Sequence, residues 1–333
     1  MSLIGNSKLT LIDYAKRKDP DGRVAKVAEI LSQTNQILDD CVMLEGNLET
    51  GHQVTIRTGL PSVYFRQING GVLPSKSKTA QVTEACGILE AFSEIDVDLA
   101  KLNGNTAEFR LSEDKAFLEA MNQTMAETMF YGNPLTDPKQ FAGFAPRLSS
   151  LSAGNAQNIL DGGGVGSDNT SIYLVGWGEN SVFCPFPKGS EAGLIHEDLG
   201  IETVELADGG RMRAYRTRYQ WKTGLVVKDW RFVVRIPNID VSNLVADSSA
   251  ANLINLMSRA LDRIENLDAC RPALYMNRTV YSMLRIQALN KSNAALAIED
   301  AMTQFGTPSK MMTFMGVPIR KVDRLLNTEA RIT

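Results

Sequence analysis

Residues 54–66 read Val-Thr-Ile-Arg-Thr-Gly-Leu-Pro-Ser-Val-Tyr-Phe-Arg, a run of β-branched and aromatic residues that a Gly-Leu-Pro turn interrupts. Further turn signals follow at Asn69-Gly-Gly and at Pro74, and residues 95–99 read Ile-Asp-Val-Asp-Leu. Short β-favouring runs between such turns are typical of strands joined by hairpins. We therefore predict a long, twisted, hairpin-like excursion between residues 54 and 97.

Two predicted helices flank this excursion. Apolar residues at helical spacing between Val24 and Leu44 predict an amphipathic helix before it. Ser112 is a suitable N-cap for a second helix over residues 112–131, because acidic residues follow it in the first turn. The apolar stripe of that second helix, which we expect to face a core, consists of Leu118, Met121, Met125 and Met129.

The C-terminal half has the pattern of a mixed α and β region after a loop rich in Gly and Ser at residues 141–171. Predicted strands cover residues 172–177, 181–184, 273–276 and 317–322, and predicted helices cover residues 253–264 and 277–289. Residues 211–221 and 225–236 are predicted to pair as a hairpin that turns at Lys222-Thr-Gly. The chain is thus expected to be an α+β protein.

Basic side chains are concentrated in the predicted hairpin, where Asp229 is the single acid and tyrosine and tryptophan residues are interleaved. The basic residues are Arg211, Arg213, Arg216, Arg218, Lys222, Lys228, Arg231 and Arg235. A cluster of one sign on adjacent strands repels itself unless something acidic meets it. We therefore expect this stretch to contact a partner, either nucleic acid or another subunit; the alternative is a solvated hairpin.

Residue types that carry catalysis or bind metals are sparse. The only histidines, His52 and His196, lack metal-ligand spacing, and the four cysteines form no C-x-x-C pair. The glycine-rich run at residues 161–166 lacks the third glycine of a dinucleotide fingerprint, and no Gly-Lys-Ser/Thr closes a phosphate loop. We predict no catalytic, cofactor or metal site. No apolar run approaches the roughly 18 to 20 residues that a membrane span needs, so no membrane partner is expected.

Three stretches in the C-terminal third resemble a known family. They are Trp-Arg-Phe-Val-Val-Arg-Ile-Pro-Asn-Ile-Asp at residues 230–240, Pro-Ala-Leu-Tyr-Met-Asn-Arg at residues 272–278, and Gly-Val-Pro-Ile-Arg-Lys-Val-Asp at residues 316–323. Thr-Glu-Ala follows at residues 328–330. In this order, they are similar to stretches of the major capsid proteins of podovirus-type tailed bacteriophages. The resemblance implies the HK97-type capsid fold over essentially the whole chain.

The resemblance also implies a division of the chain. Residues 1–50 would form an N-terminal arm, residues 51–95 an extended β-hairpin loop (the E-loop), and residues 150–307 an α/β axial domain. The peripheral domain would consist of residues 96–149 and 308–333, with a spine helix at residues 112–131. An extended loop with apolar residues but no core of its own is stable only if a partner covers it. The inter-subunit contacts that we expect are Val63, Tyr64, Phe65, Arg66, Ile68, Lys76, Lys78, Arg211, Arg213, Arg216, Arg218 and Arg231.

The function implied by the resemblance is structural and not enzymatic. The chain would assemble with itself into hexamers and pentamers of an icosahedral shell that encloses phage double-stranded DNA. A separate scaffolding protein is expected because the arm begins almost at Met1, together with a portal, a decoration or cement protein, and non-specific contact with the DNA. The protein would be part of the virion capsid and assemble in the host cytoplasm. The alternatives are an encapsulin-like protein compartment and a nucleotide-binding α/β enzyme that uses residues 162–166.

Overall fold

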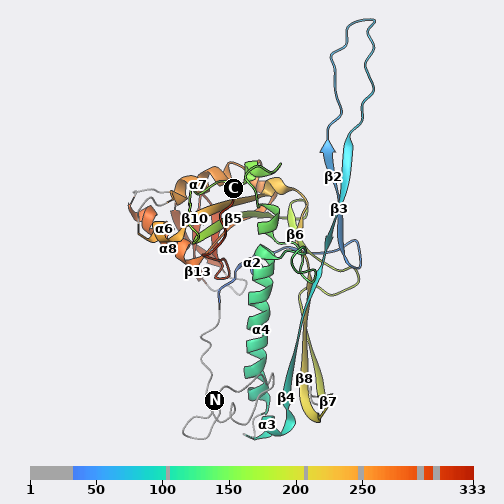
Figure 1. Ribbon diagram of the computed structural model, residues 1–333, viewed down its shortest axis with the longest axis vertical. Coiled ribbons are helices and arrows are strands. Elements are labelled where there is room, and N and C mark those ends of the chain that lie inside the picture. The colour runs from blue at the N-terminus through green and yellow to red at the C-terminus, as the bar shows by residue number, and fades with distance from the viewer. Residues whose placement is uncertain (1–32, 103–105, 206–208, 247–250, 291–295, 303–307) are drawn as a thin grey trace.

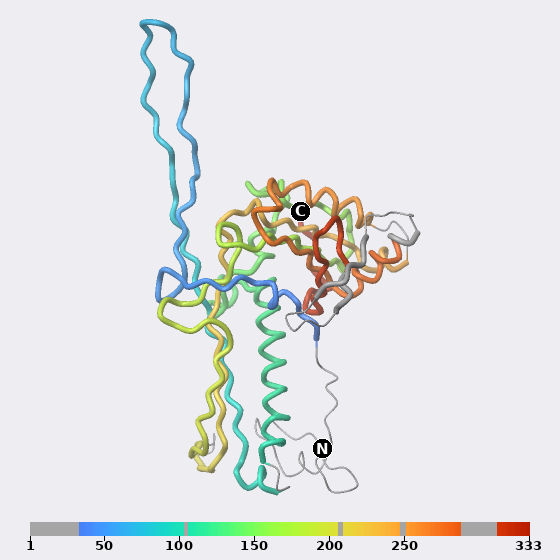
Figure 2. The backbone as a smooth tube through the Cα atoms, turned by 180° about the vertical axis from the view of Figure 1, so that it is seen from behind, coloured from blue at the N-terminus to red at the C-terminus, as the bar shows by residue number. Residues whose placement is uncertain are grey.

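The computed structural model describes residues 33–102, 106–205, 209–246, 251–290, 296–302 and 308–333. Figure 1 shows three parts: an α/β body that contains the C-terminus, a long helix beside a narrow three-stranded sheet, and a hairpin that projects in the opposite direction from that sheet. Figure 2 shows from behind that the far end of the hairpin stands clear of the rest of the chain. The fold is therefore extended, with two long projections from one body.

The body is built on a nine-stranded mixed sheet. Its main path runs β1-β6-β5-β11-β14-β13-β12, while β10 pairs with β5 and β9 pairs with β6. The strands are β1 (Met43–Glu45), β5 (Asn169–Trp177), β6 (Val182–Phe186), β9 (Val226–Val227), β10 (Val233–Asp240), β11 (Arg271–Met276), β12 (Leu296–Met302), β13 (Pro308–Phe314) and β14 (Val317–Lys321). The predicted strands over residues 172–177, 181–184, 273–276 and 317–322 are confirmed as β5, β6, β11 and β14.

Helices cover both faces of this sheet. Ile172 and Leu174 of β5 pack in a core with α7 and α8, whereas Tyr173 and Val175 pack on the other side with α5 and the end of α4. Side chains of a strand alternate between faces, so a strand covered on both sides is continuously apolar. The helices of the body are α2 (Ile37–Asp40), α5 (Phe144–Arg147), α6 (Val241–Val245), α7 (Leu253–Leu261) and α8 (Arg278–Asn290), with 3₁₀ turns η1 (Ala156–Asn158), η2 (Trp230–Phe232) and η3 (Leu267–Ala269).

The long helix α4 (Thr106–Tyr131) begins six residues before the predicted start, so Ser112 is not its N-cap. Phe109 in the added turn is buried against Ile95 and Leu99, and this packing extends the helix. The methionines at positions 121, 125 and 129 are buried, as predicted, whereas Leu118 is exposed, so its predicted place in the buried stripe is wrong. The helix ends at Tyr131, and the next residue is a glycine because a Cβ atom at position 132 would overlap the carbonyl oxygens of Thr128 and Phe141.

The three-stranded sheet beside α4 has the order β4-β8-β7, with strands β4 (Gly87–Asp96), β8 (Arg211–Thr223) and β7 (Leu194–Glu205). The predicted pairing of residues 211–221 with residues 225–236 is wrong, because β4 and β7 occupy both edges of β8. After β8, Gly224 donates a backbone hydrogen bond to the carbonyl of Pro185 (2.9 Å), and the chain crosses to the large sheet. There β9 pairs with β6, and β10 pairs with β5.

Residues 95–99 are only partly strand, contrary to the sequence pattern. Strand β4 ends at Asp96, and the short helix α3 (Val97–Lys101) begins there. The carboxylate of Asp96 accepts a hydrogen bond from the backbone N–H of Asp98 (2.8 Å) and so caps this helix. The alternation of apolar and acidic residues therefore reflects a strand end followed by a capped turn.

The helix predicted between Val24 and Leu44 is wrong for its described part, and residues 24–32 lie outside the described residues. Helix α2 has only four residues, and the chain is extended from Cys41 onwards. Strand β1 then pairs in parallel with β6, with Met43 opposite Cys184. Pairing with the large sheet therefore overrides the local helical spacing.

The projecting hairpin consists of β2 (Gly51–Gly59) and β3 (Lys78–Ala85), paired in antiparallel register from Gly51–Ala85 to Gly59–Lys78. The predicted hairpin is confirmed, but the strand expected at residues 62–66 is absent from it. Pro61 and Pro74 flank this segment on either side, and proline has no N–H to donate to a ladder. The paired strands therefore form a stalk below an unpaired tip.

Candidate assembly interfaces

The tip segment, residues 60–77, exposes most of its large apolar side chains. Relative exposure is 87% for Val63, 109% for Phe65 and 92% for Ile68, and Tyr64 is also exposed. None of these side chains belongs to a hydrophobic cluster of the described residues. An apolar surface of this kind on an extended ribbon marks a site of protein contact.

Two hydrogen bonds shape the tip segment. The N–H of Gly70 donates to the carbonyl of Gln67 (3.0 Å), closing a turn around Asn69, which has a φ of 66°. Asn is one of the residues that adopt this left-handed conformation readily. Further down, the hydroxyl of Ser75 donates to the carbonyl of Ser62 (2.7 Å) and links the two sides. The tip thus keeps its two sides together without a β-ladder.

The hairpin from Gly51 to Ala85 is positively charged. It contains Arg57, Arg66, Lys76 and Lys78 but a single acid, Glu84. Across the described part of the chain, Arg66, Lys76 and Lys78 are exposed and form no ion pair. The tip therefore offers an apolar surface with unneutralised positive charge.

The root of the hairpin, in contrast, is firmly held. Arg147 of α5 forms a two-pronged ion pair with Glu84 of β3, with N–O distances of 2.5 and 2.7 Å. The same guanidinium donates to the backbone carbonyls of Ala142 (3.2 Å) and Leu225 (3.1 Å). Bidentate pairing of this kind fixes direction as well as distance. Sequence reasoning missed this contact, since its residues lie far apart in the chain and neither stands in a motif.

Two arginines in the middle of β8 meet acids on both neighbouring strands. Arg218 pairs with Glu90 of β4 (2.6 Å) and with Glu197 of β7 (3.5 Å). The hydrogen bond from Arg218 lowers the pKa of Glu90, and the same bond raises the pKa of Arg218. The sheet therefore supplies, within the chain, the acidic partner that the sequence pattern lacked.

Arg216 lies in a second rung of this ladder. It pairs with Glu94 of β4 (3.3 Å) and Glu202 of β7 (3.2 Å), and its guanidinium lies over the ring of Phe92 at 4.4 Å. Nearby, Arg110 of α4 pairs with Asp198 at 2.8 Å, and this hydrogen bond lowers the pKa of Asp198. The repulsion between these arginines, from which we inferred an acidic partner outside the chain, is thus relieved by acids of the same chain.

The other arginines of the run that were predicted to make contacts lie in two different environments. Arg231 pairs with Asp229 (2.7 Å) and Glu265 (3.0 Å), and the hydrogen bond to Asp229 raises its pKa. Arg211 and Arg213 are exposed at the outer end of β8 and have no ion-pair partner in the described part of the chain. The structure therefore does not gather the predicted contact residues into one surface.

Arg235 is the buried member of the run. It lies in the body, where its guanidinium pairs with Glu329 at 2.8 Å and both side chains are about one-twentieth exposed. Ser171 and Tyr131 also donate hydrogen bonds to the Glu329 carboxylate, and burial raises the pKa of Tyr131. This cluster ties the C-terminal tail to β5, β10 and the last turn of α4. No sequence pattern indicates this cluster, because Glu329 is distant along the chain from its partners.

The glycine-rich run at residues 161–166 has no free N–H cradle for a phosphate. The N–H groups of Gly162 and Gly164 donate to the carbonyls of Pro237 (2.9 Å) and Asn238 (2.7 Å), and that of Gly163 donates to the side chain of Asp161 (2.9 Å). The run therefore packs against the end of β10. Nowhere in the described ranges do three or more His, Cys, Asp or Glu side chains gather as metal ligands.

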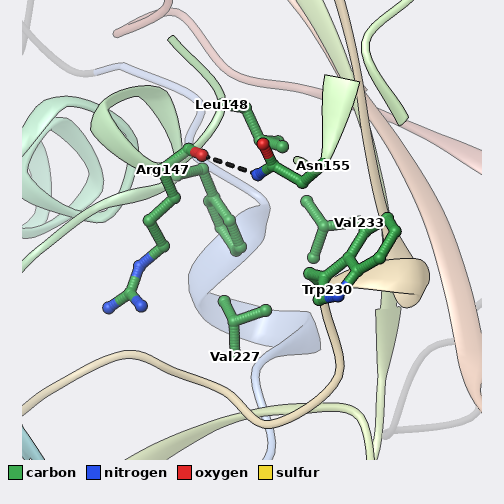
Figure 3. Close-up of a pocket in the computed structure, with 7 residues that line it drawn as sticks. Arg147, Leu148, Asn155, Val227, Trp230 and Val233 are labelled. Carbon is green, nitrogen blue, oxygen red and sulfur yellow. Dashed lines mark hydrogen bonds between the residues drawn. The ribbon is translucent and has the colours of Figure 1, made fainter. Parts of the chain in front are cut away.

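A pocket of about 130 Å³ lies between α5, β9 and β10 (Figure 3). Its lining consists of Phe144, Arg147, Leu148, Asn155, Val227, Trp230 and Val233. The amide of Asn155 donates to the backbone carbonyl of Arg147 (2.9 Å), and Figure 3 shows the guanidinium directed away from Trp230. The amide of Asn155 is thus engaged with the protein itself. Among the described helices, none is long and apolar enough to span a membrane.

Comparison with known proteins identifies the family. Residues 19–333 match the family described as Major capsid protein GP7, while no curated protein matches the chain. Among solved structures, a chain of bacteriophage Epsilon15 is similar, with 34% identity, a TM-score of 0.78, and coverage of 100% of this chain and 99% of that one.

Weaker likenesses are found to a capsid chain of bacteriophage JBD30 and to an encapsulin of Synechococcus elongatus PCC 7942. The JBD30 chain has 8% identity, a TM-score of 0.48 and coverage of 89% and 92%. The encapsulin has 11% identity, a TM-score of 0.41 and coverage of 69% and 96%. The Epsilon15 match confirms the expected α+β, HK97-type capsid fold. The chain belongs to the phage major capsid proteins of the GP7 family.

Proposed function

We propose that the chain assembles with itself into the hexamers and pentamers of an icosahedral shell around phage double-stranded DNA, and that the projecting hairpin makes the principal contact between subunits. The observation that carries this proposal is the uncovered tip segment, where Val63, Phe65 and Ile68 are almost fully exposed. A two-stranded ribbon is marginally stable alone in water, so cover from a neighbour stabilises it. A contact between unlike surfaces of successive subunits closes rings, as capsomers require.

The charge of the hairpin defines the receiving surface. Because Arg66, Lys76 and Lys78 carry positive charge beside the apolar tip, the neighbour should offer an apolar surface with acidic residues at its rim. Arg211 and Arg213 are further contact residues, and their charges are not paired within the described part of the subunit. In this proposal Arg216, Arg218 and Arg231 would contact a neighbour with their charges already paired in the subunit.

The same proposal assigns a structural role to each part of the chain. Residues 1–50 act as the arm, residues 51–95 as the extended loop, residues 150–307 as the axial domain, and residues 96–149 with 308–333 as the peripheral domain. A separate scaffolding protein, a portal and a decoration protein assist, the DNA contact is non-specific, and assembly takes place in the host cytoplasm. The projecting hairpin supports the assignment of the extended loop, and helix α4 beside a narrow sheet supports that of the spine helix.

Shortening the hairpin tests the proposal. We would replace residues 60–77 by Asn-Gly, which forms a two-residue hairpin turn and retains the paired strands β2 and β3. The variant should fold with an unchanged circular dichroism spectrum, yet form no shells by electron microscopy under conditions in which the unaltered chain does. The matched control, Phe65→Leu with Ile68→Val, keeps an apolar tip and should form shells. Closed shells from the shortened variant would overturn the proposed contact.

A further inference from the structure

The turn at the end of the projecting hairpin contains an asparagine followed by two glycines. Asn69 has a φ of 66°, and the N–H of Gly70 donates to the carbonyl of Gln67 at 3.0 Å. Residues 69–71 are exposed, and a Cβ atom built at position 71 would meet nothing within 4 Å. Within the described part of the chain, the side-chain amide of Asn69 forms no hydrogen bond. The amide and the backbone that follows it are therefore free to move relative to each other.

This arrangement favours a reaction between asparagine and its own backbone. Asparagine is a thermolabile residue, because the backbone nitrogen of the next residue can attack its side-chain amide carbon. Most side chains on the next residue shield that nitrogen, whereas glycine has no Cβ atom and leaves it open. The attack also needs the backbone to rotate, which a loop tip without packed neighbours permits. The pair Asn69–Gly70 meets both conditions.

We propose that Asn69 is a site of spontaneous deamidation on the free subunit, and that the reaction weakens the ability of the subunit to assemble. The Gly70 nitrogen forms a bond to Cγ of Asn69, the bond from Cγ to Nδ2 breaks, and ammonia leaves with the proton of the Gly70 N–H. Water then opens the resulting cyclic imide at either carbonyl. The product is an aspartate or an isoaspartate, and no oxidant, reductant or enzyme takes part.

Asn238 is a natural control for this reaction. Its backbone is also left-handed, with a φ of 57°, but the residue is only 1% exposed. Its side-chain nitrogen donates to Asp161 and to the carbonyl of Ile332, both at 2.9 Å, and its side-chain oxygen accepts from the N–H of Ile332 at 2.8 Å. The next residue is Ile239, whose branched side chain shields the attacking nitrogen. Asn238 should therefore keep its amide.

The effect on assembly rests on the proposed function of the hairpin tip. The new carboxylate lies in a hairpin where Arg66, Lys76 and Lys78 form no ion pair within the described part of the chain. It lowers the positive charge that the tip offers to an acidic rim, and an isoaspartate also lengthens the backbone of the turn.

Assembly, in turn, protects the asparagine. The hydrogen bond from Gly70 to Gln67 must open before the Gly70 nitrogen attacks, and in the free subunit nothing packs on the turn to keep it closed. A neighbour that covers the tip holds the turn in place and slows the attack. Deamidation thus limits the time for which an unassembled subunit stays competent.

The first test keeps the purified, unassembled full-length chain in mildly alkaline buffer and follows it by tryptic peptide mass mapping. The peptide Gln67–Lys76 contains Asn69 as its single asparagine, and the Asn-Gly at residues 103–104, outside the described residues, falls in another peptide. We expect Asn69 to exchange its NH₂ for OH several-fold faster than Asn238 does, with part of the product methylated by a purified isoaspartate methyltransferase. Gly70→Ala should slow the exchange several-fold. A rate at Asn69 no higher than that at Asn238 would rule out the site.

The second test compares Asn69→Asp, which carries the charge of the product, with Asn69→Gly, which cannot react and also adopts a positive φ. Asn69→Asp should need a several-fold higher protein concentration to form shells, and Asn69 of the unaltered chain should react several-fold more slowly in shells than in free subunits. Equal assembly of the two variants, or equal rates in shells and free subunits, would contradict the effect on assembly. Mass mapping of the free subunit does not depend on shell formation, so failure of the modification site and failure of the assembly contact give different results.

Discussion

The projecting hairpin and the β4-β8-β7 sheet are both narrow β-structures that leave the body in opposite directions, yet they satisfy their side chains differently (Figure 1). The sheet has α4 packed on one face, and Arg216 and Arg218 at its centre are paired with acids of adjacent strands. The tip of the hairpin has no layer on either side, and its aromatic and basic residues meet nothing in the described chain. Of the two regions, the hairpin leaves the larger share of its apolar side chains uncovered.

This difference shows which sequence feature indicates an interface. The dense basic run of β8 attracts notice in the sequence, but charges that alternate across three strands neutralise one another at little cost. The apolar residues of the tip cannot be stabilised by pairing charges, because they become stable only when they are removed from water. Uncovered apolar surface is therefore the stronger sign of assembly than a concentration of charge.

The first prediction contrasts one phenylalanine from the hairpin tip with one from the three-stranded sheet. Phe65→Ala should leave the free energy of unfolding of the subunit unchanged within about 0.5 kcal/mol, since the ring touches nothing. It should raise the protein concentration needed for assembly by roughly tenfold or more, as expected for an aromatic anchor at an interface. Phe92→Ala should instead lower subunit stability by about 1 kcal/mol, because Arg216 covers its ring.

Urea unfolding of the subunit and light scattering during assembly measure the two effects. The control is Phe65→Leu, which keeps an apolar side chain and should assemble nearly as well as the unaltered chain. A result in which Phe65→Ala destabilises the subunit but assembles normally would show that the tip packs on its own chain. The assignment of the two regions would then be reversed.

The sequence predicted those elements whose signals are local. Strands β5, β11 and β14 are short apolar runs with clear ends, and the predicted helix over residues 277–289 corresponds to α8, which Asn277 caps by accepting a hydrogen bond from the N–H of Thr279 at 2.9 Å. Strand β7 was missed because its polar residues match a loop, and only pairing with β8 makes it a strand. Residues 225–236 follow β8 closely in the chain, which favoured the prediction of a hairpin with β8. Both edges of β8 are in fact paired with β4 and β7, so this hairpin cannot form.

The candidate interface could be predicted in part for the same reason. The apolar residues of the tip are evident from the sequence, since no helical or strand pattern buries them. The pairing of Arg147 with Glu84 joins residues 63 positions apart and could not be predicted, because a single charged residue gives no sign of its partner. Long-range charge pairs are fixed by the fold and cannot be inferred before it.

The second prediction concerns the ion pair between Arg147 and Glu84 at the root of the hairpin. Arg147→Leu leaves the partly buried carboxylate of Glu84 without its partner and removes two hydrogen bonds to backbone carbonyls. We expect a loss of about 2 kcal/mol in the free energy of unfolding, together with faster hydrogen exchange in β2 and β3. Arg324→Leu is the matched control, because its pair with Glu127 is more exposed and lies away from the hairpin. Equal losses in both variants would show that the root pair is not special.

The smallest expected change in subunit stability concerns the ion pairs that Arg218 of β8 forms with Glu90 and Glu197, and it depends on pH. Arg218→Gln should lower subunit stability less than Arg147→Leu does, because exposed ion pairs are screened by water. The hydrogen bond from Arg218 lowers the pKa of Glu90 from its ordinary value of 4.5, so this pair stabilises the fold above that pH. As the pH falls through the lowered pKa, Glu90 gains a proton and its contribution is lost. The difference between the unaltered chain and Arg218→Gln in urea unfolding should therefore shrink in acid, and a difference that grows there would mean that the ladder is not held by charge.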